Sequence, residues 1–385
     1  MLPKILIFHT LRWPNAARLA IAFRQLGCAV DALALSDYPL DKLSAVERAH
    51  VYRPLTPLRS IRAAIEQSGP NLIIPCDEGA VAQLLRLHRQ SNAPSLRTLI
   101  ERSLGRVEGY ERIATRSNLP GIAAEAEVRT PPARLVATGR ELGEALPQLG
   151  FPAVLKADYS WSGDGVRIVR DRAEAERAFA RMTGAWPRLS AMKRLLRDRD
   201  LELYLHRFRM RNPVLTLQAF IAGREANAAL ACWRGEIVAS LCAEVLMTRS
   251  ASRNASVVRI VDNEDMLETA RRVVRLAGIS GFCGLDFILE AGSDHPYLIE
   301  INPRATQINH LALGPGRDLA AALCACAAGA PVAERPAVTT RDAIALFPHE
   351  WHRDPQSPYL RTAYHDVPWE EPELVRINAK APRAS

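Results

Sequence analysis

Apolar runs and helical stretches alternate along the first part of the chain. Strands are predicted at residues 5–9, 29–35 and 71–75, and helices at residues 15–26, 58–67 and 79–88. Strands that alternate with helices predict βαβ units and a parallel sheet. The segment after the first strand lacks the G-x-G-x-x-G pattern, so dinucleotide binding is not supported.

Between residues 91 and 218 the pattern becomes a helical connector and then a mixed unit. The connector, residues 91–130, ends in a Pro-rich run. Strands of the mixed unit are predicted at 134–137, 153–158 and 166–169, and its helices at 140–149 and 173–182. This order predicts a compact α+β unit.

The last part of the chain carries longer apolar strands. In residues 219–335 we predict strands at 226–234 and 236–246, a helix at 262–278, an apolar hairpin at 281–304 and a helix near 317–328. Residues 336–385 form a shorter tail with one strand at 342–347. The hairpin prediction rests on two β-prone arms around a turn, residues 291–296, that contains Gly, Ser, Asp and Pro.

The hairpin carries the most informative polar residues of the chain. Side chains alternate faces along a strand, so Glu300 and Asn302 share a face, and Asp286 on the other arm can meet them. Two carboxylates and an amide oxygen are ligands suited to Mg²⁺. Arg304 adds a cation that can hold a phosphate through two hydrogen bonds. The alternative is a half-exposed face with ordinary charges, but a charged pair within apolar strands needs a partner.

A second pattern, at residues 151–166, is typical of phosphate binding. The strand at 153–158 carries Lys156, and a Gly- and Ser-containing loop at 160–165 follows it. Backbone N–H groups of such a loop can bind phosphates, and the lysine can reach the same groups. An ordinary loop is the alternative, and the hairpin makes the phosphate interpretation more specific.

These features together resemble the ATP-grasp superfamily. The resemblance covers the order of parts from residue 1 to about 335, including the strand lysine, the Gly-rich loop, a hinge at 217–225, and Asp286 with the segment 300–304. That segment is similar to the metal-binding segment of carbamoyl phosphate synthetase and biotin carboxylase. The resemblance points to the carboxylate–amine ligases within the superfamily.

The fold that the resemblance implies combines α/β and α+β parts. A Rossmann-like pre-ATP-grasp domain is expected in residues 1–105, followed by a two-lobed ATP-grasp domain in residues 106–335 and a C-terminal extension in residues 336–385. Within the ATP-grasp domain, a lid subdomain is expected at about 130–218 and a metal-binding subdomain at about 219–335.

The resemblance also implies residues that bind the phosphates of ATP. Lys156 is expected at the α- and β-phosphates, with a catalytic role shared with Arg304 at the γ-phosphate. The loop residues expected to close over the β- and γ-phosphates are Ser160, Ser162, Gly163 and Gly165. The second phosphate-binding lysine, expected on the connector helix, is missing. Arg112 keeps the positive charge and is the candidate in its place.

The remaining nucleotide and metal roles are implied in the same way. The adenine slot is expected to be lined by Gln218, Ala219 and Ile221, and Glu225 is expected to accept from the ribose hydroxyls; a surface charge is the alternative for Glu225. The residues implied to hold Mg²⁺ or Mn²⁺ are Asp286, Glu300 and Asn302.

Composition is that of a globular protein of two or three lobes. The chain has 385 residues, and no apolar run approaches the length of a membrane span. The N-terminus is interpreted as a first strand, not as a signal peptide. The seven cysteines are dispersed without a CxxC pair, so neither a zinc site nor a disulfide framework is indicated, and buried thiols in a reducing cytoplasm are expected.

The chain carries a net charge of +8, and much of the excess lies at residues 188–211. A solvated basic face is the first interpretation, ahead of attraction of anionic substrates and of RNA binding. No aromatic and basic interleaving or nucleic-acid motif accompanies the segment, so no nucleic-acid partner is expected.

The substrate-binding residues are the least defined. Arg253 or Arg259, in a polar loop predicted at 248–259, is a candidate anchor for an acidic substrate; a mobile surface loop is the alternative. His349 and His352 lie in a Pro-containing segment expected to be irregular, and are interpreted as structural or surface residues. Polar candidates at strand ends of the first domain are His9, Arg12, Asp77 and Glu78.

These patterns predict an enzyme that joins a carboxylic acid to an amine. ATP would activate the acid as an acyl phosphate, with release of ADP and phosphate, a reaction that needs charge neutralisation more than a protein nucleophile. The alternatives are a catalytically inactive ATP-binding regulatory module and a ligase that modifies a protein or an RNA-associated partner. A biotin carboxylase is not expected, because Asn309 stands where that family has Glu. The expected partners are small-molecule substrates, with a homodimer contact in the tail as one possibility among several.

Overall fold

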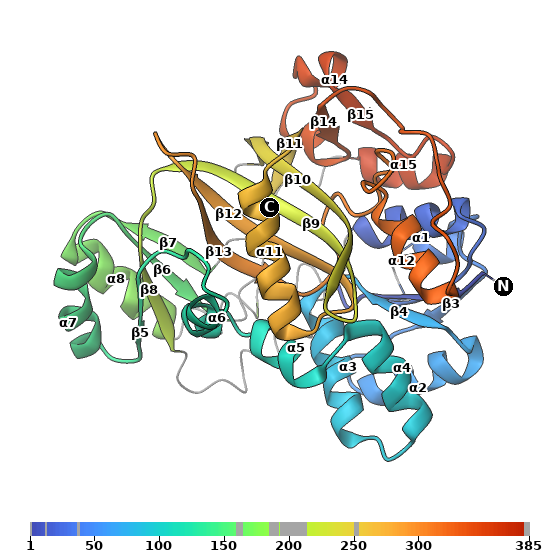
Figure 1. Cartoon of the computed structure of the whole chain (residues 1–385), viewed down its shortest axis with the longest axis horizontal. Coiled ribbons are helices and arrows are strands. Elements are labelled where there is room, and N and C mark those ends of the chain that lie inside the picture. Colours follow the sequence, from blue (N-terminus) through green and yellow to red (C-terminus); the bar gives the residue numbers. More distant parts are fainter. Residues whose placement is uncertain are drawn as a thin grey trace. The chain divides into compact units, whose positions relative to one another are not determined.

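The computed structural model describes residues 2–11, 14–36, 39–158, 165–184, 192, 214–249 and 254–380. The chain divides into two compact units, and Figure 1 labels their elements. Unit 1 comprises Met1–Ala114, Glu225–Asp286 and Ile301–Ser385, and unit 2 comprises Thr115–Arg224 and Phe287–Glu300.

Unit 1 begins with a four-stranded parallel sheet in the order β3-β2-β1-β4. Its strands are β1 (Lys4–Phe8), β2 (Ala29–Ala34), β3 (Arg48–Val51) and β4 (Leu72–Pro75). Its helices are α1 (Asn15–Gln25), the short 3₁₀ helix η1 (Pro39–Lys42), α2 (Pro57–Ser68) and α3 (Glu78–Gln90). The predicted parallel sheet is confirmed. The sequence pattern misses β3 because this edge strand is mostly exposed and has no apolar run.

A seven-stranded sheet has the order β13-β12-β9-β10-β11-β14-β15. Its strands are β9 (Gly223–Trp233), β10 (Glu236–Thr248), β11 (Ala255–Val261), β12 (Gly281–Glu290), β13 (Pro296–Asn302), β14 (Ala343–Leu346) and β15 (Tyr364–Asp366). The predicted hairpin is confirmed, since β12 and β13 are hydrogen-bonded neighbours. Helix α11 (Glu264–Ala277) packs against β10, as Figure 1 shows, and α12 (Leu319–Ala328) packs against β10 and α1.

Unit 2 contains a four-stranded antiparallel sheet in the order β5-β8-β6-β7. Its strands are β5 (Ala133–Val136), β6 (Ala153–Ala157), β7 (Val166–Val169) and β8 (Leu215–Ala219), and its helices include α7 (Gly139–Leu149) and α8 (Arg172–Thr183). Both helices pack on the sheet and share a core with it. Thr138 and Glu141 form a capping box that starts α7. The α+β unit predicted for this part of the chain is confirmed.

One hydrophobic core joins the parallel sheet to the seven-stranded sheet within unit 1. It includes buried side chains of α1, β1, β2, β10 and α12. The ring centroids of Phe23 and Phe282 lie 6.2 Å apart, and the sulfur atoms of Cys28 and Cys324 lie 3.0 Å apart. Because apolar burial is continuous, the N-terminal sheet and the seven-stranded sheet are stabilised together.

The connector is helical, as the sequence predicts. Its elements are α4 (Pro94–Leu104), α5 (Val107–Ile113), the 3₁₀ helix η2 (Arg116–Asn118) and α6 (Leu119–Glu125). Gly105, with φ of 94°, turns the chain between α4 and α5, and a Cβ there would lie 2.0 Å from the carbonyl oxygen of Gly278. Glycine is therefore required where the connector meets the end of α11.

The structure corrects two expectations, one for residues 255–259 and one for the tail. Residues 255–259, expected within a polar loop, belong to β11, because Val257 and Val258 are buried and pair with β10 and β14. His349 and His352, expected in an irregular segment, lie on helix α13 (His349–Arg353). The tail also contains α14 (Tyr359–Thr362) and α15 (Pro372–Ala379), and its strands β14 and β15 complete the seven-stranded sheet. None of the helices in the described ranges is long and apolar enough to cross a membrane.

Asp77 connects the loop after β1 to the start of α3. Its buried carboxylate accepts hydrogen bonds from Thr10 N at 2.6 Å, Thr10 Oγ1 at 2.8 Å and Leu11 N at 3.0 Å. It also caps α3 by accepting from Ala80 N at 2.8 Å. This carboxylate therefore orders the loop rather than facing a substrate.

Replacing Asp77 with alanine is expected to lower the free energy of unfolding by about 3–5 kcal/mol, because buried donors lose a charged acceptor. Urea denaturation checks this, with Glu108→Ala on the exposed face of α5 as the control. A loss of about 1 kcal/mol or less, the usual size for a surface substitution, would contradict the prediction.

Candidate functional site

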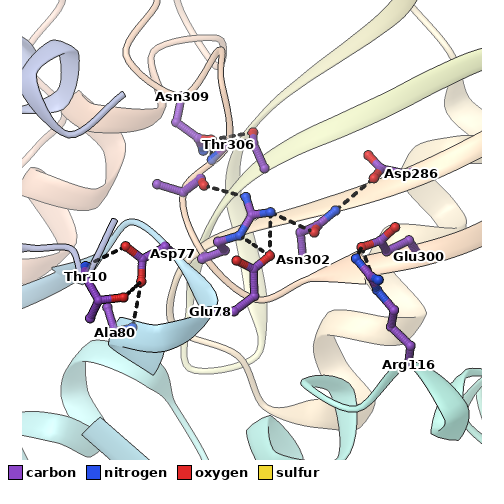
Figure 2. Close-up of polar contacts among 12 residues, drawn as sticks. Thr10, Asp77, Glu78, Ala80, Arg116, Asp286, Glu300, Asn302, Thr306 and Asn309 are labelled. Carbon is purple, nitrogen blue, oxygen red and sulfur yellow. Dashed lines mark hydrogen bonds and ion pairs between the residues drawn. The ribbon is translucent and has the colours of Figure 1, made fainter. Parts of the chain in front are cut away.

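A chain of side-chain contacts runs from the middle of β12 across the end of β13 to the start of α3 in unit 1 (Figure 2). Asn302 Nδ2 donates to Asp286 Oδ2 at 2.9 Å, and Asn302 Oδ1 accepts from Arg304 Nη2 at 3.1 Å. Arg304 Nε donates to Glu78 Oε1 at 2.8 Å, and the guanidinium also approaches this oxygen at 2.7 Å. The four residues form one connected polar arrangement that alternates negative, neutral, positive and negative groups.

Hydrogen bonds from three elements hold the backbone around Arg304 in place. Arg304 N donates to Asn302 O at 2.7 Å, and Ala305 N donates to Pro75 O, at the end of β4, at 3.3 Å. Tyr110 of α5 is buried and its hydroxyl donates to Pro303 O. The side chain of Arg304 is only 11% exposed, so its charge is largely shielded from solvent and its contacts matter more than those of a surface arginine.

Glu300, two residues before Asn302 on β13, is held by Arg116 in unit 2. Arg116 donates to Glu300 Oε1 from Nε at 3.0 Å and from Nη2 at 2.5 Å, and donates to Ala157 O from Nη1 at 3.5 Å. Figure 2 shows the guanidinium directed at the carboxylate. Sequence reasoning missed Arg116 and selected Arg112, four residues earlier. Arg116 follows the α5 helix at the start of η2, and this change of element is the signal that could have found it.

Lys156 lies on β6, as predicted, and its Nζ donates to Ile299 O at 3.1 Å. This contact brings the lysine to the β13 residue next to Glu300 within unit 2. Gly165 is buried and its carbonyl accepts from Ala157 N at 2.9 Å, at the end of the predicted lid loop. The lid residues Ser160, Ser162 and Gly163 lie outside the described residues, as does the basic segment 188–211 apart from Met192.

The predicted hinge is a short link between two strands. Gln218 is buried on β8, Ala219 ends β8, and residues 220–222 lead directly into β9. Ala219 N donates to Pro132 O at 2.8 Å, which fixes the end of β8 to the start of β5. Ile221 is half-buried and Glu225 is exposed on β9. The chain passes from unit 2 to unit 1 between residues 224 and 225, at the end of this link.

The other predicted cations are dispersed. Arg112 is exposed on α5. Arg259 is on β11, where its Nε lies 3.6 Å from Asp342 Oδ2 and its side chain is 49% exposed. Arg253 and Arg12 lie outside the described residues. Of the candidate cations that the structure describes, Lys156 and Arg304 are therefore the ones that lie next to the β12–β13 residues.

The histidine at the end of β1 is buried and neutral. Burial lowers the pKa of His9 from 6.5 to about 4, and its hydrogen bond to Leu11 O only partly opposes this effect. In the unfolded chain the same imidazole gains a proton near its ordinary pKa of about 6.5. The unfolded state therefore binds more protons than the folded state between these two pH values.

The free energy of unfolding is consequently expected to fall as the pH is lowered from 6.5 to about 4, by roughly 3 kcal/mol from His9 alone. Urea midpoints across this range check the prediction. His9→Gln should flatten the dependence, and His295→Gln on the exposed turn should leave it unchanged. Equal slopes for the His9→Gln variant and the parent chain would contradict it.

The oxygen donors of the β12–β13 segment fit a hard divalent cation. Asp286 and Asn302 are within hydrogen-bond distance of each other, and Glu300 is two residues from Asn302 on the same strand. Carboxylate and amide oxygens are the donors that Mg²⁺ prefers. Within the described ranges, no group of three or more His, Cys, Asp or Glu side chains is placed to hold a metal. The candidate ligands agree with that finding, because only two of them, Asp286 and Glu300, are of these residue types and the third, Asn302, is an amide.

Several solved structures share the fold of this chain. One is biotin carboxylase from Campylobacter jejuni, with a TM-score of 0.63 and 17% identity; the match covers 86% of this chain and 72% of that chain. Another is L-amino acid ligase from Bacillus licheniformis, with a TM-score of 0.58 and 18% identity; the match covers 88% of this chain and 77% of that chain. An N5-carboxyaminoimidazole ribonucleotide synthetase has a TM-score of 0.61 and 15% identity over 88% and 80%. At these identities the likeness shows the ATP-grasp fold alone.

Sequence comparison matches part of the chain to a family model. Residues 196–307 match the family model of the ATP-grasp domain. This match and the ATP-grasp fold of the solved structures confirm the resemblance to the ATP-grasp superfamily that the sequence predicts.

Two curated relatives are formate-dependent phosphoribosylglycinamide formyltransferases. The chain is 32% identical to the one from Marinobacter nauticus over 154 residues, which is 39% of this chain and 37% of that protein. It is also 32% identical to the one from Hahella chejuensis over 165 residues, which is 42% of this chain and 38% of that protein. The chain therefore matches less than two fifths of the length of these relatives.

Proposed function

We propose that this protein is an ATP-dependent ligase that joins a small carboxylic acid to an amine. The observation that carries the proposal is the connected arrangement of Asp286, Asn302, Arg304 and Glu78, with Glu300 two residues away on β13. It combines oxygen ligands for a cation with a shielded guanidinium, the two kinds of group that transfer of a phosphoryl group needs. The relatives and structural neighbours that are named as ligases, carboxylases or formyltransferases agree with this chemistry.

The metal ion in this proposal is Mg²⁺ or Mn²⁺, held by Asp286, Glu300 and Asn302. When bound, the cation would neutralise charge on the phosphates of ATP. Asn302 would offer its amide oxygen Oδ1, which has a second lone pair besides the one that accepts from Arg304 Nη2.

The nucleotide in this proposal is ATP. Lys156 and Arg116 are the proposed phosphate-binding cations of unit 2, and the loop with Ser160, Ser162, Gly163 and Gly165 would close over the phosphates. Gln218, Ala219 and Ile221 would line the adenine slot, largely through backbone groups, and Glu225 would accept from the ribose. The direct link between β8 and β9 supports a hinge at these positions.

In the proposed reaction, the substrate carboxylate attacks the γ-phosphoryl group of ATP and forms an acyl phosphate with release of ADP. The amine then attacks the acyl carbon, an amide bond forms, and inorganic phosphate leaves. Arg304 would stabilise the charge that develops on the transferred phosphoryl group. Its two contacts with Glu78 and Asn302 hold the guanidinium in one orientation, so little reorganisation is needed during the reaction.

The direct test is phosphate release from ATP in a screen of small carboxylic acids with and without amines. Hydroxylamine should trap the acyl phosphate as a hydroxamate when an acid is supplied without an amine. The expected result is ADP and hydroxamate formation that requires the acid and Mg²⁺. Tight ATP binding without turnover for any acid would instead favour the inactive regulatory module.

Arg116 and Arg112 provide a matched pair of variants for the nucleotide site. Arg116→Ala is expected to raise KM for ATP by about 10–100-fold, since one charged hydrogen bond is worth about 1.5–3 kcal/mol. Arg112→Ala, on the exposed face of α5, is expected to change KM much less. If Arg112→Ala raised KM for ATP more than Arg116→Ala did, Arg112 and not Arg116 would be the phosphate-binding residue.

A further inference from the structure

His349 is an unusual histidine at the start of α13. It is 7% exposed, and neither ring nitrogen has a hydrogen-bond partner within the part of the chain that the structure describes. A buried polar group without a partner costs about 1–3 kcal/mol of stability. Such a group in a folded protein calls for an explanation, and a ligand that supplies the missing partner is one.

The strand register brings His349 and Arg249 to the same end of the sheet. Thr248, the last residue of β10, is opposite Ala255 at the start of β11. Since Val257 is opposite Ala345 and β11 is antiparallel to β14, the end of β14 lies at this same sheet edge. Arg249 leaves the sheet immediately after β10, and α13 begins shortly after β14 and packs against both β11 and β14.

The surroundings of His349 are positive. Burial lowers the pKa of His349 to about 4, and the charges of Arg249 and His352 add to this effect. Burial and Arg249 also lower the pKa of His352, one helical turn away. The adjacent Glu350 does not balance them, because it accepts from Arg353 Nε at 2.7 Å and from Ser357 Oγ. Among described carboxylates, none forms an ion pair with Arg249.

Two imidazoles and a guanidinium in this arrangement suit an anion. A divalent cation would be repelled by Arg249, and no third metal ligand joins the two histidines within the described ranges. An anion would supply an acceptor for a His349 N–H and a charge for Arg249. We propose that Arg249 and His349 form a carboxylate-binding subsite, which, given the ligase function proposed above, would hold the acid substrate.

This subsite differs from the substrate anchor expected from sequence, for which Arg253 lies outside the described residues. Arg259 lies beside Asp342 and is half exposed, so its charge is partly balanced and accessible to water. Arg249 differs because the side chains that it affects are the imidazoles of His349 and His352, whose pKa values it lowers, and not a carboxylate. The tail, which sequence reasoning could not interpret, would then contribute a substrate-binding residue through α13.

The test is an NMR titration of the His349 imidazole in the full chain without ATP. Acetate, succinate and inorganic phosphate are the probes. A saturable shift with a carboxylate is expected, together with a rise in the pKa of His349 from about 4, because a bound anion stabilises the protonated ring. Arg249→Gln should abolish the shift of the His349 signal on addition of carboxylate without changing the melting temperature. His349→Gln should remove that imidazole signal. The signal of the exposed His295 should not shift.

Three results would overturn the proposal. The first is no saturable shift with either carboxylate. The second is binding of phosphate alone, which would indicate a phosphate subsite. The third is saturable Zn²⁺ binding that His349→Gln and His352→Gln abolish, with no response to anions.

Failure of the ligase function would be seen separately. In that case hydroxamate formation would be absent while the carboxylate response of His349 remained. If both proposals hold, Arg249→Gln should raise KM for the acid by about tenfold or more and leave KM for ATP unchanged, as expected for loss of one charged contact.

Discussion

Replacing Glu300 with alanine is expected to lower kcat for acid-dependent phosphate release by about 10³-fold, the loss typical of removing a group that organises transition-state charge. Glu300 is two residues from Asn302 on β13 and is engaged by Arg116, so its removal would leave both the proposed metal site and a phosphate-binding cation without their carboxylate. The measurement is phosphate release at saturating Mg²⁺ and ATP with the acid identified in the screen.

Glu290→Ala is the matched control for Glu300. Glu290 ends β12 in the same hairpin, and its carboxylate accepts from Ser293 Oγ at 2.6 Å on the exposed turn. This variant should keep the parent rate. A group that acts in the transition state normally contributes far more than about tenfold to kcat. If the kcat of Glu300→Ala were within about tenfold of the parent value, Glu300 would not belong to the proposed metal site.

Replacing Arg304 with alanine is expected to lower kcat by about 10²–10³-fold, with a smaller effect on KM for ATP, because its charge is proposed to act mainly in the transition state. Arg304→Lys keeps the charge but loses the planar group that contacts both Glu78 and Asn302, so an intermediate rate is expected. The measurements are kcat and KM from phosphate release and single-turnover ADP formation.

A double-mutant cycle with Glu78→Gln tests whether Glu78 positions Arg304. The two substitutions should be non-additive in kcat, because Glu78 acts through the guanidinium that the second substitution removes. Arg271→Ala is the control, since Arg271 pairs with Glu264 at the surface of α11. Additive effects of Glu78→Gln and Arg304→Ala would show that Glu78 acts independently, and a KM effect without a kcat effect would contradict the transition-state role of Arg304.

Much of the fold can be predicted from the sequence because its elements carry strong local signals. The parallel strands β1, β2 and β4 are apolar runs, and the β12–β13 hairpin combines β-prone arms with a turn of Gly, Asp and Pro. Elements that lack such signals are missed. The edge strand β3 is mostly exposed, and β11 carries Ser and Arg beside its buried valines.

The candidate site divides in the same way. Asp286, Glu300, Asn302 and Arg304 share one hairpin, so strand alternation alone predicts that they act together. The contacts of Arg116 with Glu300 and of Glu78 with Arg304 could not be found by this reasoning, because each joins residues about 180–230 positions apart in sequence, a separation over which no local pattern operates.

The sequence by itself therefore determined the resemblance to the ATP-grasp superfamily, the strand lysine and the hairpin with its candidate metal ligands, because these depend on short-range spacing. The tertiary structure alone decided which cations meet the hairpin and which side chains were left without partners. It selected Arg116 for Glu300 and Glu78 for Arg304, and it brought Arg249 to the sheet end at which His349 is buried. The physical reason is that these contacts join strands and helices that only the completed sheets and the shared core bring together.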